Sequence, residues 1–494
     1  MGNLLLRSAF LRDLEAAHAK EALMAKAGAA AAVWAADLAV DAGLPILILA
    51  GTGNNGGDAF VAARHLRERS FDVHLVFVGD PDGQSQDAAS ARVEFVAAGG
   101  VCKTEIPELL RWGLVVDGLF GIGLSRAPEG VYADWIRYVN GLAERDGCPI
   151  LALDCPSGLN ADTGRAYGPT IVASHTLTFL AAKPGLYTAD GPDHCGCVRI
   201  DYLQLDGALG DCPGGCLNSR EAFAEHLLPR RRNTHKGSFG SVGVVGGAHS
   251  MVGAALLAGR AALRLGAGRV YLGLVDPDAP SFDPGCPELM LRKPEGVLEA
   301  GLTALGCGPG LGNSLIANEL LEKALTVDLP LVLDADALNL IAFEPALKKA
   351  VAERTSSTVL TPHPLEAARL LDCDLADVQA DRIGTATELA WRFDSHVALK
   401  GCGTVIASPK GQWWINPTGN PGLASAGTGD TLTGFVLALL AQGWTPEAAL
   451  LGGVYLHGAA ADTLVTSGIG PVGLTASELV DTGRRLLNRW IHGG

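Results

Sequence analysis

The chain has 494 residues, of which 48% are hydrophobic and 18% charged, and its formal net charge is −15. This length predicts about two to four domains, and the apolar share is typical of a folded enzyme and excludes a disordered scaffold. The acidic balance argues against a nucleic-acid partner, because a phosphate backbone is bound by a basic surface.

The N-terminal segment predicts an amphipathic helix. It carries scattered charges at Arg7, Arg12, Asp13 and Glu15, and it lacks the clean apolar stretch and cleavage site of a signal peptide. No run of about 18 apolar residues occurs, so we expect a soluble protein with no membrane partner.

The cysteine content favours a cytoplasmic protein. Eleven cysteines are an odd number spread over a long chain, which indicates reduced thiols and not a disulfide framework. Cys195, Cys197, Cys212 and Cys216 resemble half of a zinc site, but their irregular spacing makes a zinc site the less favoured interpretation.

In the first half, short apolar runs alternate with helical segments, which predicts a parallel sheet covered on both faces. The expected strands are residues 44–50, 73–78, 114–116, 150–153, 175–180 and 198–202, and the expected helices are residues 59–69, 86–98 and about 132–145.

A turn-rich stretch, residues 206–219, and a basic stretch, residues 229–236, then interrupt the pattern. We place the domain boundary there, with domains of residues 1–215 and 216–494. The run Arg230–Arg232 is expected to be a solvated linker. The second half resumes an α/β pattern, and its expected strands are residues 241–245, 270–275, 302–305, 331–333, 358–360, 397–399 and 404–407.

Polar and glycine-rich loops follow three strands of the first half. Because ligands bind outside the carboxyl ends of parallel strands, these loops predict a site. The segment GTGNNGGD, residues 51–58, offers the amides of Asn54 and Asn55 and the carboxylate of Asp58, which suits a ribose or polyol. The alternative is a strand–helix turn capped by Asp58.

Asp117 and Asp154 each end an apolar strand. Partial burial there raises the pKa of a carboxyl group and suits acid–base work, and Asp117 or Asp154 would equally coordinate a cation with Ser157 and an asparagine carbonyl. The alternative is that each aspartate caps the helix that follows.

Residues 416–434 read NPTGNPGLASAGTGDTLTG and precede an apolar helix. Glycine-rich backbone at a helix N-terminus forms an anion site, most often for phosphate. A phosphate would repel the carboxylate of Asp430, so we expect Asp430 to perform chemistry there; the alternative is a helix N-cap.

Further candidates in the second half flank that loop. His363 lies between two prolines, which hold its backbone extended, and Lys400 ends a strand where a nucleotide phosphate would bind. Asp334 and Asp336 are candidate metal ligands, although alternation favours one of them facing solvent or capping a helix. Together these features predict phosphoryl transfer in which Asp430 takes a proton from a substrate hydroxyl.

The motifs GTGNNGGDAFVAARHL, VVDGLFGIGL and LDCPSGLNADTG resemble the epimerase domain of the NAD(P)H-hydrate repair family. KGSFGSVGVVGG, GPGLG, VLDADALN, LTPHPLEAARLL and NPTGNPGLASAGTGDTLTG resemble its dehydratase domain. The resemblance implies an N-terminal Rossmann-like doubly wound sheet followed by a C-terminal ribokinase-like α/β domain.

The resemblance also implies the chemistry. The first domain would interconvert the R and S hydrates of NADH and NADPH. The second would dehydrate the S form at the expense of ADP, giving AMP and phosphate, with Mg²⁺ accompanying the nucleotide. Potassium is implied in the epimerase domain, and a homo-oligomer is implied for the whole protein.

Carried onto this sequence, the resemblance assigns Asp154 and Asp430 as catalytic residues. The residues that would contact the hydrate in the epimerase are Asn54, Asn55, Gly56, Gly57, Asp58, Gly121, Ile122, Gly123, Leu124, Ser125, Arg126, Ala127 and Asp154. Those that would contact it in the dehydratase are Ala254, Gly310, His363 and Asp430. The nucleotide would be held by Lys400, Gly401, Cys402, Gly403, Thr404 and Gly429, and potassium by Asn55, Asp117 and Ser157.

Four departures from the family pattern change no functional group: Ala59, Cys155, Leu365 and Ala426. One alternative is a vitamin- or sugar-type kinase with an accessory nucleotide-binding domain, which leaves Asp117 and Asp154 without a role. A second is a regulatory nucleotide-binding protein, against which the intact Asp154 and Asp430 argue.

Overall fold

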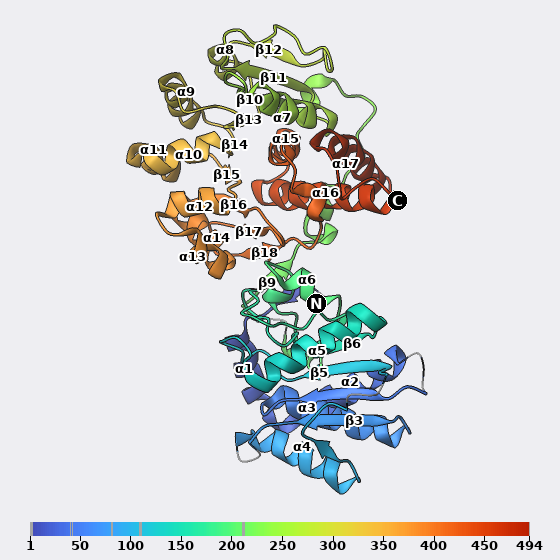
Figure 1. The fold of residues 1–494 in the computed structure, drawn as a ribbon. Helices are drawn as coiled ribbons and strands as arrows, with labels where there is room; N and C mark the ends of the chain where they lie inside the picture. Colours follow the sequence, from blue (N-terminus) through green and yellow to red (C-terminus); the bar gives the residue numbers. More distant parts are fainter. Residues whose placement is uncertain are drawn as a thin grey trace. The chain divides into compact units, whose positions relative to one another are not determined.

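The computed structural model describes residues 3–39, 41, 43–80, 83–107, 111–209 and 213–493. The chain divides into two compact units, Met1–Cys216 and Leu217–Gly494. Both are built of helices around a mostly parallel sheet (Figure 1).

The first unit contains a seven-stranded sheet in the order β4-β3-β2-β5-β6-β7-β8, and every neighbouring pair is parallel. The strands are β2 (Ile46–Ala50), β3 (Val73–Phe77), β4 (Cys102–Lys103), β5 (Leu114–Gly118), β6 (Ile150–Leu153), β7 (His175–Phe179) and β8 (Cys197–Asp201). A short antiparallel pair joins β1 (Leu4–Leu5) to β9 (Gly215–Leu217).

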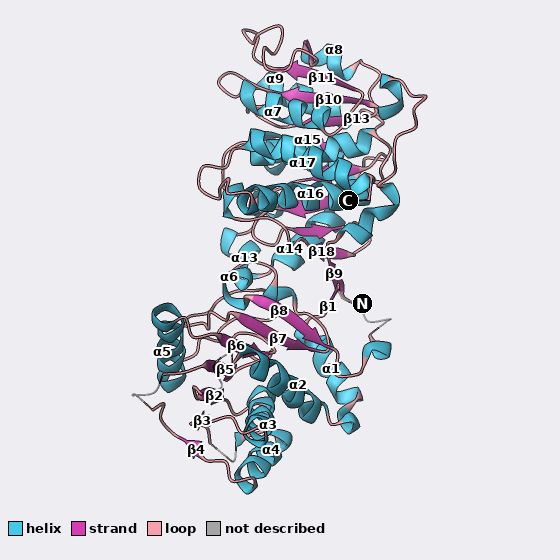
Figure 2. Cartoon of the chain, turned by 90° about the vertical axis from the view of Figure 1, so that its right-hand side faces the viewer, coloured by secondary structure: helices cyan, strands magenta, loops and turns pink. Residues whose placement is uncertain are grey.

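Alternating side chains of each strand serve the two faces of this sheet. Ile46 and Ile48 pack into one cluster with α2 (Leu23–Leu38), α3 (Asn54–Glu68) and α4 (Gln86–Ala97). Leu47 and Leu49 pack into another with α5 (Gly130–Asp146). Figure 2 shows α5 on one side of the strands and α2 to α4 on the other. The doubly wound sheet expected from the sequence is therefore present.

Helix α3 begins earlier than the sequence suggests. The prediction placed its start at Ala59, whereas it begins at Asn54 with Gly53 as N-cap. Asp58 thus lies inside the helix and does not cap it. The early start depends on small residues, because a Cβ on Gly56 would lie 1.9 Å from the carbonyl oxygen of Gly51.

The topology places this helix start at a switch point. Strand β2 pairs with β3 on one side and with β5 on the other, so the chain reverses its direction of travel across the sheet after β4. Open α/β sheets bind their ligands at such a point, outside the carboxyl ends of the strands.

The second unit carries its own sheet in the order β18-β17-β16-β15-β14-β13-β10-β11-β12. Pairs from β12 to β16 are parallel, whereas β17 and β18 are antiparallel additions. The strands are β10 (Ser241–Gly246), β11 (Arg269–Leu274), β12 (Met290–Arg292), β13 (Ala304–Cys307), β14 (Leu331–Leu333), β15 (Thr358–Leu360), β16 (His396–Leu399), β17 (Val405–Ala407) and β18 (Trp413–Ile415).

Two groups of helices cover this sheet (Figure 1). One face carries α7 (Val252–Arg264), α15 (Thr428–Ala441), α16 (Pro446–Thr466) and α17 (Ala476–Ile491). The other carries α9 (Leu315–Leu325), α10 (Asp336–Phe343), α11 (Pro345–Ala352), α12 (Pro364–Leu371), α13 (Leu375–Ala380) and α14 (Arg382–Arg392).

Helix α16 is the one helix of the described residues that is long and apolar enough to cross a membrane by length and composition. Its most apolar window is 72% buried inside the unit, where it packs between α15 and α17. This burial is that of a core helix.

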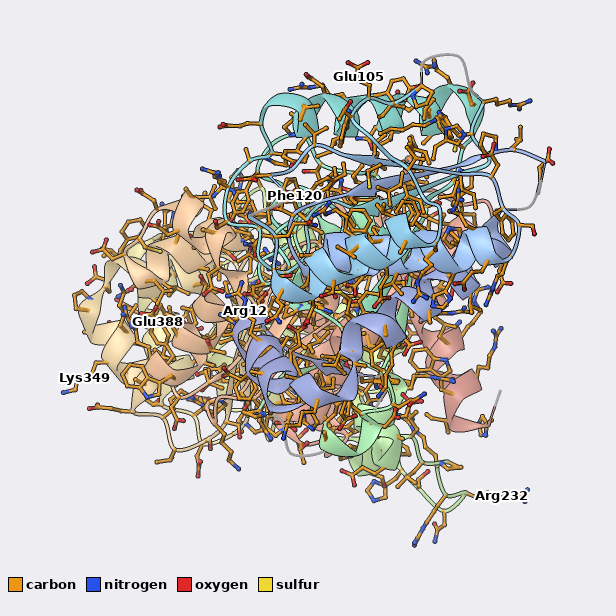
Figure 3. The ribbon with its side chains drawn as sticks, turned by 90° about the horizontal axis from the view of Figure 1, so that it is seen from below. Arg12, Glu105, Phe120, Arg232, Lys349 and Glu388 are labelled. Atoms are coloured by element: carbon orange, nitrogen blue, oxygen red, sulfur yellow. The ribbon has the colours of Figure 1, made fainter. Side chains whose placement is uncertain are left out.

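The basic run after the boundary is only partly the solvated linker that the sequence predicts. Arg232 is exposed and extends away from the protein (Figure 3). Arg230 instead donates to the carbonyl of Gly266 at 2.7 Å and lies over the ring of Phe239. One of the three arginines thus packs onto the second unit.

Candidate functional site

The first candidate site lies at the switch point of the first unit, where the first turn of α3 meets the end of β5. Asn55 is 7% exposed and donates from Nδ2 to the carbonyl of Phe120 at 3.0 Å. Its Oδ1 is buried without a hydrogen-bond partner. Asn54 instead accepts a hydrogen bond from Ser85 at 2.6 Å. A buried acceptor of this kind can be satisfied by a water molecule or a cation.

Asp117 lies near the carboxyl end of β5 and is fully buried. Ser157 donates to it from the backbone N–H at 2.8 Å and from Oγ at 2.7 Å. The N–H of Phe120 in turn donates to Ser157 Oγ at 2.9 Å. Burial raises the pKa of Asp117 to about 6, although the Ser157 hydrogen bonds oppose the shift.

The predicted potassium ligands therefore lie in one connected network. Asn55, Asp117 and Ser157 all contact Phe120 or each other and present oxygen atoms with a single carboxylate among them. No group of three or more His, Cys, Asp or Glu side chains that would hold a metal occurs in the described part of the chain. Oxygen donors with little charge suit a hard cation of low charge.

Asp154 follows β6 in an unusual backbone conformation. Its φ is +63°, a left-handed value that a non-glycine residue adopts only under constraint. The constraint comes from β7: the Asp154 N–H donates to the Leu177 carbonyl at 2.6 Å, and Lys183 donates a short hydrogen bond to Asp154 Oδ1. The other oxygen, Oδ2, lies 3.3 Å from the position of a Cβ on Gly121.

Two further carboxyl groups, those of Asp58 and Glu15, lie close enough to Asp154 to interact with it electrostatically. Burial raises the pKa of Asp58 well above its usual value, and the Asp154 and Glu15 charges add to the shift. Burial also raises the pKa of Glu15, which lies on α1 (Ser8–Ala17). Sequence reasoning missed Glu15 and Lys183 as site residues. Lys183 comes shortly after the carboxyl end of β7, but only the fold shows that β7 lies beside β6, the strand that precedes Asp154.

The other predicted hydrate contacts are less tightly grouped. Gly121 lies against Asp154 and Asn55, and the carbonyl of Ile122 accepts a hydrogen bond from Arg12 at 3.4 Å. Ser125 and Arg126 are exposed. Within residues 121–127, the structure thus brings Gly121 close to the carboxylate of Asp154. Of the other predicted hydrate contacts, Gly123 is exposed, Leu124 and Ala127 are half-buried, and Gly56 and Gly57 are buried in α3.

The second candidate site lies at the N-terminus of α15. Gly427 is the N-cap with φ +86°, and Asp430 lies in the first turn. Asp430 therefore does not cap the helix. Burial raises the pKa of Asp430 to about 6, with Asp334 adding to the shift and Lys400 opposing it. A carboxylate of this kind is ionised near neutral pH and still basic enough to take a proton.

Lys400 is committed to a buried carboxylate. Its Nζ donates to Asp334 Oδ1 at 2.7 Å, and Thr433 of α15 donates to Asp334 Oδ2 at 2.8 Å. Burial pulls the pKa of Lys400 down, but the Asp334 and Glu366 charges outweigh it and the pKa is raised. The ammonium lies 3.6 Å from the position of a Cβ on Gly429. Lys400 thus remains charged beside the anion-attracting turn of α15.

The structure separates the two aspartates that were candidates for a shared metal. Asp334 pairs with Lys400, whereas Asp336 Oδ2 accepts a hydrogen bond from the N–H of Gly312 at 2.8 Å. Asp336 also lies in the first turn of α10. Asp336 does not cap that helix, because Ala335 is the N-cap; its carboxylate instead binds the loop at Gly312.

His363 caps α12 and faces Glu366. Its Nδ1 accepts hydrogen bonds from the N–H groups of Leu365 and Glu366, so its proton lies on Nε2, 3.2 Å from Glu366 Oε1. Burial lowers the pKa of His363 and raises that of Glu366 to about 7. Glu366 was not predicted as a site residue.

The remaining predicted residues of the second unit fall at two loops. Gly310 and Ala254 lie together, because a Cβ on Gly310 would be 3.2 Å from that of Ala254. Both flank the switch point between β10 and β13. Gly401, Cys402, Gly403 and Thr404 form the turn between β16 and β17. Arg382, a 3% exposed side chain that the sequence did not single out, supports this turn by donating to the carbonyl of Lys400 at 3.3 Å.

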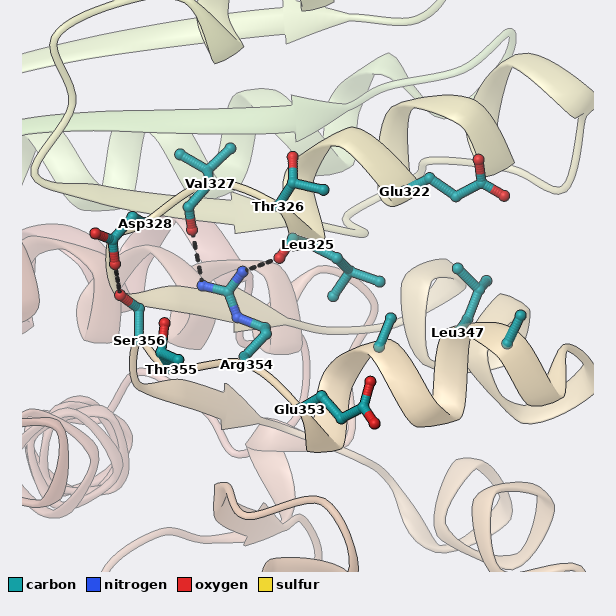
Figure 4. Close-up of a pocket in the computed structure, with 12 residues that line it drawn as sticks. Glu322, Leu325, Thr326, Val327, Asp328, Leu347, Glu353, Arg354, Thr355 and Ser356 are labelled. Atoms are coloured by element: carbon teal, nitrogen blue, oxygen red, sulfur yellow. Dashed lines mark hydrogen bonds between the residues drawn. The ribbon is translucent and has the colours of Figure 1, made fainter.

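A cavity of about 470 Å³ lies elsewhere in the second unit, between α9 and α11 (Figure 4). Arg354 occupies it and donates to the backbone carbonyls of Val327 and Leu329 at 3.1 and 2.8 Å. No predicted site residue lines it. The cavity is held by structural hydrogen bonds and is separate from the chemistry at α15.

Two family models match the chain, one within each of the two units. Residues 242–484 match the family model described as NAD(P)H-hydrate dehydratase, and residues 20–185 match that described as YjeF-related protein N-terminus. The bifunctional NAD(P)H-hydrate repair enzyme Nnr of Escherichia coli is 38% identical over 90% of this chain and 85% of its own length. The bifunctional NAD(P)H-hydrate repair enzyme of Leishmania major is 37% identical over 96% of this chain and 91% of its own length.

A solved structure resembles the second unit. The ADP/ATP-dependent NAD(P)H-hydrate dehydratase of Bacillus subtilis, co-crystallised with ATP and Mg²⁺, is 34% identical with a TM-score of 0.50. The match covers 56% of this chain and 98% of that one.

Proposed function

The chain belongs to the family of bifunctional NAD(P)H-hydrate repair enzymes, and from this premise we propose which residues perform its two reactions. The activity is the epimerisation of R and S hydrates of NADH and NADPH and the ADP-dependent dehydration of the S form to NAD(P)H. The two compact units and the two matched segments support epimerisation by residues 1–215 and dehydration by residues 216–494.

In the dehydratase unit, Asp430 is the base. It takes the proton of the hydrate hydroxyl while the terminal phosphoryl group of ADP passes to that oxygen, which releases AMP. The phosphate then leaves with its bonding electrons, a neighbouring ring carbon loses a proton, and reduced nicotinamide is regenerated. The pKa of about 6 at the positive end of α15 is the observation that carries this proposal.

The other dehydratase residues have supporting roles. The first N–H groups of α15, including that of Gly429, and the charge of Lys400 stabilise the transferring phosphoryl group. Residues 400–404 hold the nucleotide, and Ala254, Gly310 and His363 contact the hydrate. Mg²⁺ would balance the nucleotide phosphates, as supported by the ATP and Mg²⁺ of the solved relative.

In the epimerase unit, Asp154 is the acid–base residue, and Asn54–Asp58 with residues 121–127 line the hydrate site. The carboxylate oxygen that faces Gly121 supports this assignment, because it is the one not held by Lys183. Asp154 takes the proton of the hydrate hydroxyl as the bond between the hydroxyl-bearing carbon and the ring nitrogen opens to an aldehyde and an amine, and it returns the proton when that bond re-forms on the opposite face.

Potassium is part of the same proposal. Asn55, Asp117 and Ser157 would hold it, and the buried Asn55 Oδ1 without a partner supports a cation there. The ion would fix the loop around Phe120. We expect K⁺, compared with Na⁺ at equal ionic strength, to raise the melting temperature of the protein and its epimerase rate several-fold. Asp117→Asn should remove both responses; if it does not, the cation binds elsewhere.

We further propose a homo-oligomer in the cytoplasm. Exposed apolar side chains such as Leu315 and Phe343 support contact with a second copy. The cysteines that the structure describes form no disulfide, which supports a reducing compartment. Sedimentation of the pure protein tests the oligomer, and a monomer at micromolar concentration contradicts it.

One assay tests the proposed function. Mixed NADH hydrates are supplied with ADP and then with ATP, and the recovery of reduced-nicotinamide absorbance is followed. We expect complete recovery, because epimerisation feeds the R form into the S-specific dehydratase. Recovery of the S fraction alone means that the epimerase is silent, and no recovery with either nucleotide contradicts the proposal.

A further inference from the structure

Lys183 is a buried ammonium group whose role the proposed reaction leaves open. It lies just after β7, is 1% exposed, and makes three hydrogen bonds. Its Nζ donates to Asp154 Oδ1, to Thr178 Oγ1 at 2.9 Å and to the carbonyl of Phe179 at 2.8 Å. A lysine ammonium has three donors, so none is left for a ligand. Lys183 can therefore act on the hydrate only through Asp154.

These contacts distinguish the two oxygens of Asp154. Oδ1 accepts from Lys183 and, at 3.4 Å, from the N–H of Phe179. Oδ2 instead lies 3.3 Å from the position of a Cβ on Gly121. The ammonium thus links Oδ1 to β7 through hydrogen bonds and leaves Oδ2 available to the predicted hydrate site.

Other titratable groups lie near Asp154. Asp58 of α3 and Glu15 of α1 interact with it, and the Asp154 charge adds to the rise in the pKa of each. Asp117 and Cys155 also lie nearby, and Arg12 is a second cation but at an exposed position. Among these groups, Lys183 is the cation that contacts Asp154 directly.

We propose that Lys183 is the positioning residue of the epimerase, which holds Asp154 Oδ1 through a charged hydrogen bond and turns its Oδ2 toward the hydrate. This rests on the proposed role of Asp154 as the acid–base residue. Without Lys183 the Asp154 carboxylate is free to rotate and loses its cation partner, so the loss of Lys183 should impair proton transfer more than hydrate binding.

The test is the pH profile of epimerisation in the full-length chain. Pure R hydrate is supplied with ADP and an excess of S-specific dehydratase, so that recovered absorbance reports epimerisation after correction for the uncatalysed rate. In Lys183→Met we expect the acidic limb of kcat/KM to move up by at least one pH unit, which is a tenfold loss or more on that limb. The KM for the hydrate should change less than kcat.

Two variants separate this role from a structural one. Lys183→Gln keeps a hydrogen-bond donor but no charge and should move the limb as Lys183→Met does, so it replaces Lys183→Met if that variant melts below the assay temperature. Thr178→Val removes a hydrogen-bond acceptor of Lys183 but keeps its charge, and should leave the limb in place. Dehydration of S hydrate by the second unit should be unchanged in all three.

The outcomes are distinct. A lower rate or melting temperature with an unmoved acidic limb in the uncharged variants overturns the role of Lys183. An Asp154→Asn variant that retains epimerase activity instead overturns the assignment of Asp154 in the proposed function.

Discussion

Each unit contains a buried lysine–aspartate pair at the carboxyl ends of its parallel strands, but only the pair in the first unit includes the proposed base. In the first unit, Lys183 is bonded to Asp154, the proposed base itself. In the second, Lys400 is bonded to Asp334, and Asp430 lies nearby without that direct partner and with a pKa of about 6. One arrangement orients the base, whereas the other sets its basicity through a neighbouring charge.

The largest effect that tests this comparison is the loss of Asp430. Asp430→Asn should reduce dehydration of S hydrate by about 10²–10⁴-fold, because a positioned general base contributes that much. Epimerisation of R to S hydrate in the same protein should be unchanged, which makes the first unit the control. Dehydration that survives in this variant would move the base to another residue.

Removing Asp334 should alter the second pair without removing the base. In the wild-type protein, dehydration should fall about tenfold per pH unit below pH 6, because protonated Asp430 accepts no proton. The Asp334 charge raises the pKa of Asp430, so Asp334→Asn should move this acidic limb to lower pH. This direction is opposite to that expected for Lys183→Gln in the first unit.

Asp334→Asn should also destabilise the protein. It leaves the Lys400 ammonium without its carboxylate partner, which costs on the order of 3 kcal/mol for a buried pair. Thermal unfolding measures the cost. Asp336→Asn is the matched control, since Asp336 contacts a backbone N–H and not Lys400, and its charge raises the pKa of Asp430 less than the Asp334 charge does. Equal limb shifts in both variants would show that Asp334 has no special relation to Asp430.

The smallest effect concerns the open oxygen of Asp154. A Cβ on Gly121 would lie 3.3 Å from Oδ2, a contact tighter than most, so Gly121→Ala should reduce epimerase kcat/KM several-fold. Gly123→Ala is the control, because its Cβ would meet only Arg12 Nη2 at 3.9 Å. If both variants behave alike, the loop and not the carboxylate contact limits the rate.

The sequence predicts most of the sheets because buried parallel strands are continuous apolar runs. The expected strands at 150–153, 331–333 and 358–360 coincide with β6, β14 and β15. The start of α3 was wrong, because asparagines and glycines favour turns locally and only their packing on Gly51 shows that a helix fits. Two-residue strands such as β4 carry too few apolar residues to be recognised.

The ion pairs were beyond sequence reasoning for a different reason. Lys183 reaches Asp154 because β7 is the neighbour of β6, and Lys400 reaches Asp334 across 66 residues. Strand order determines both contacts, and apolar runs do not encode strand order. The motifs therefore marked Asp154, Lys400 and Asp430 as candidates without showing that Lys183 pairs with Asp154 or that Asp334 pairs with Lys400.

Cys155 directly follows the proposed epimerase base, and its surroundings determine how readily its thiol reacts. Cys155 is completely buried, and burial raises the pKa of its thiol well above its usual value. Oxidants and alkylating reagents attack the thiolate, and here that form is suppressed and enclosed. The chain thus places, next to its proposed epimerase base, a thiol whose reactive thiolate form is disfavoured by burial and shielded from solvent.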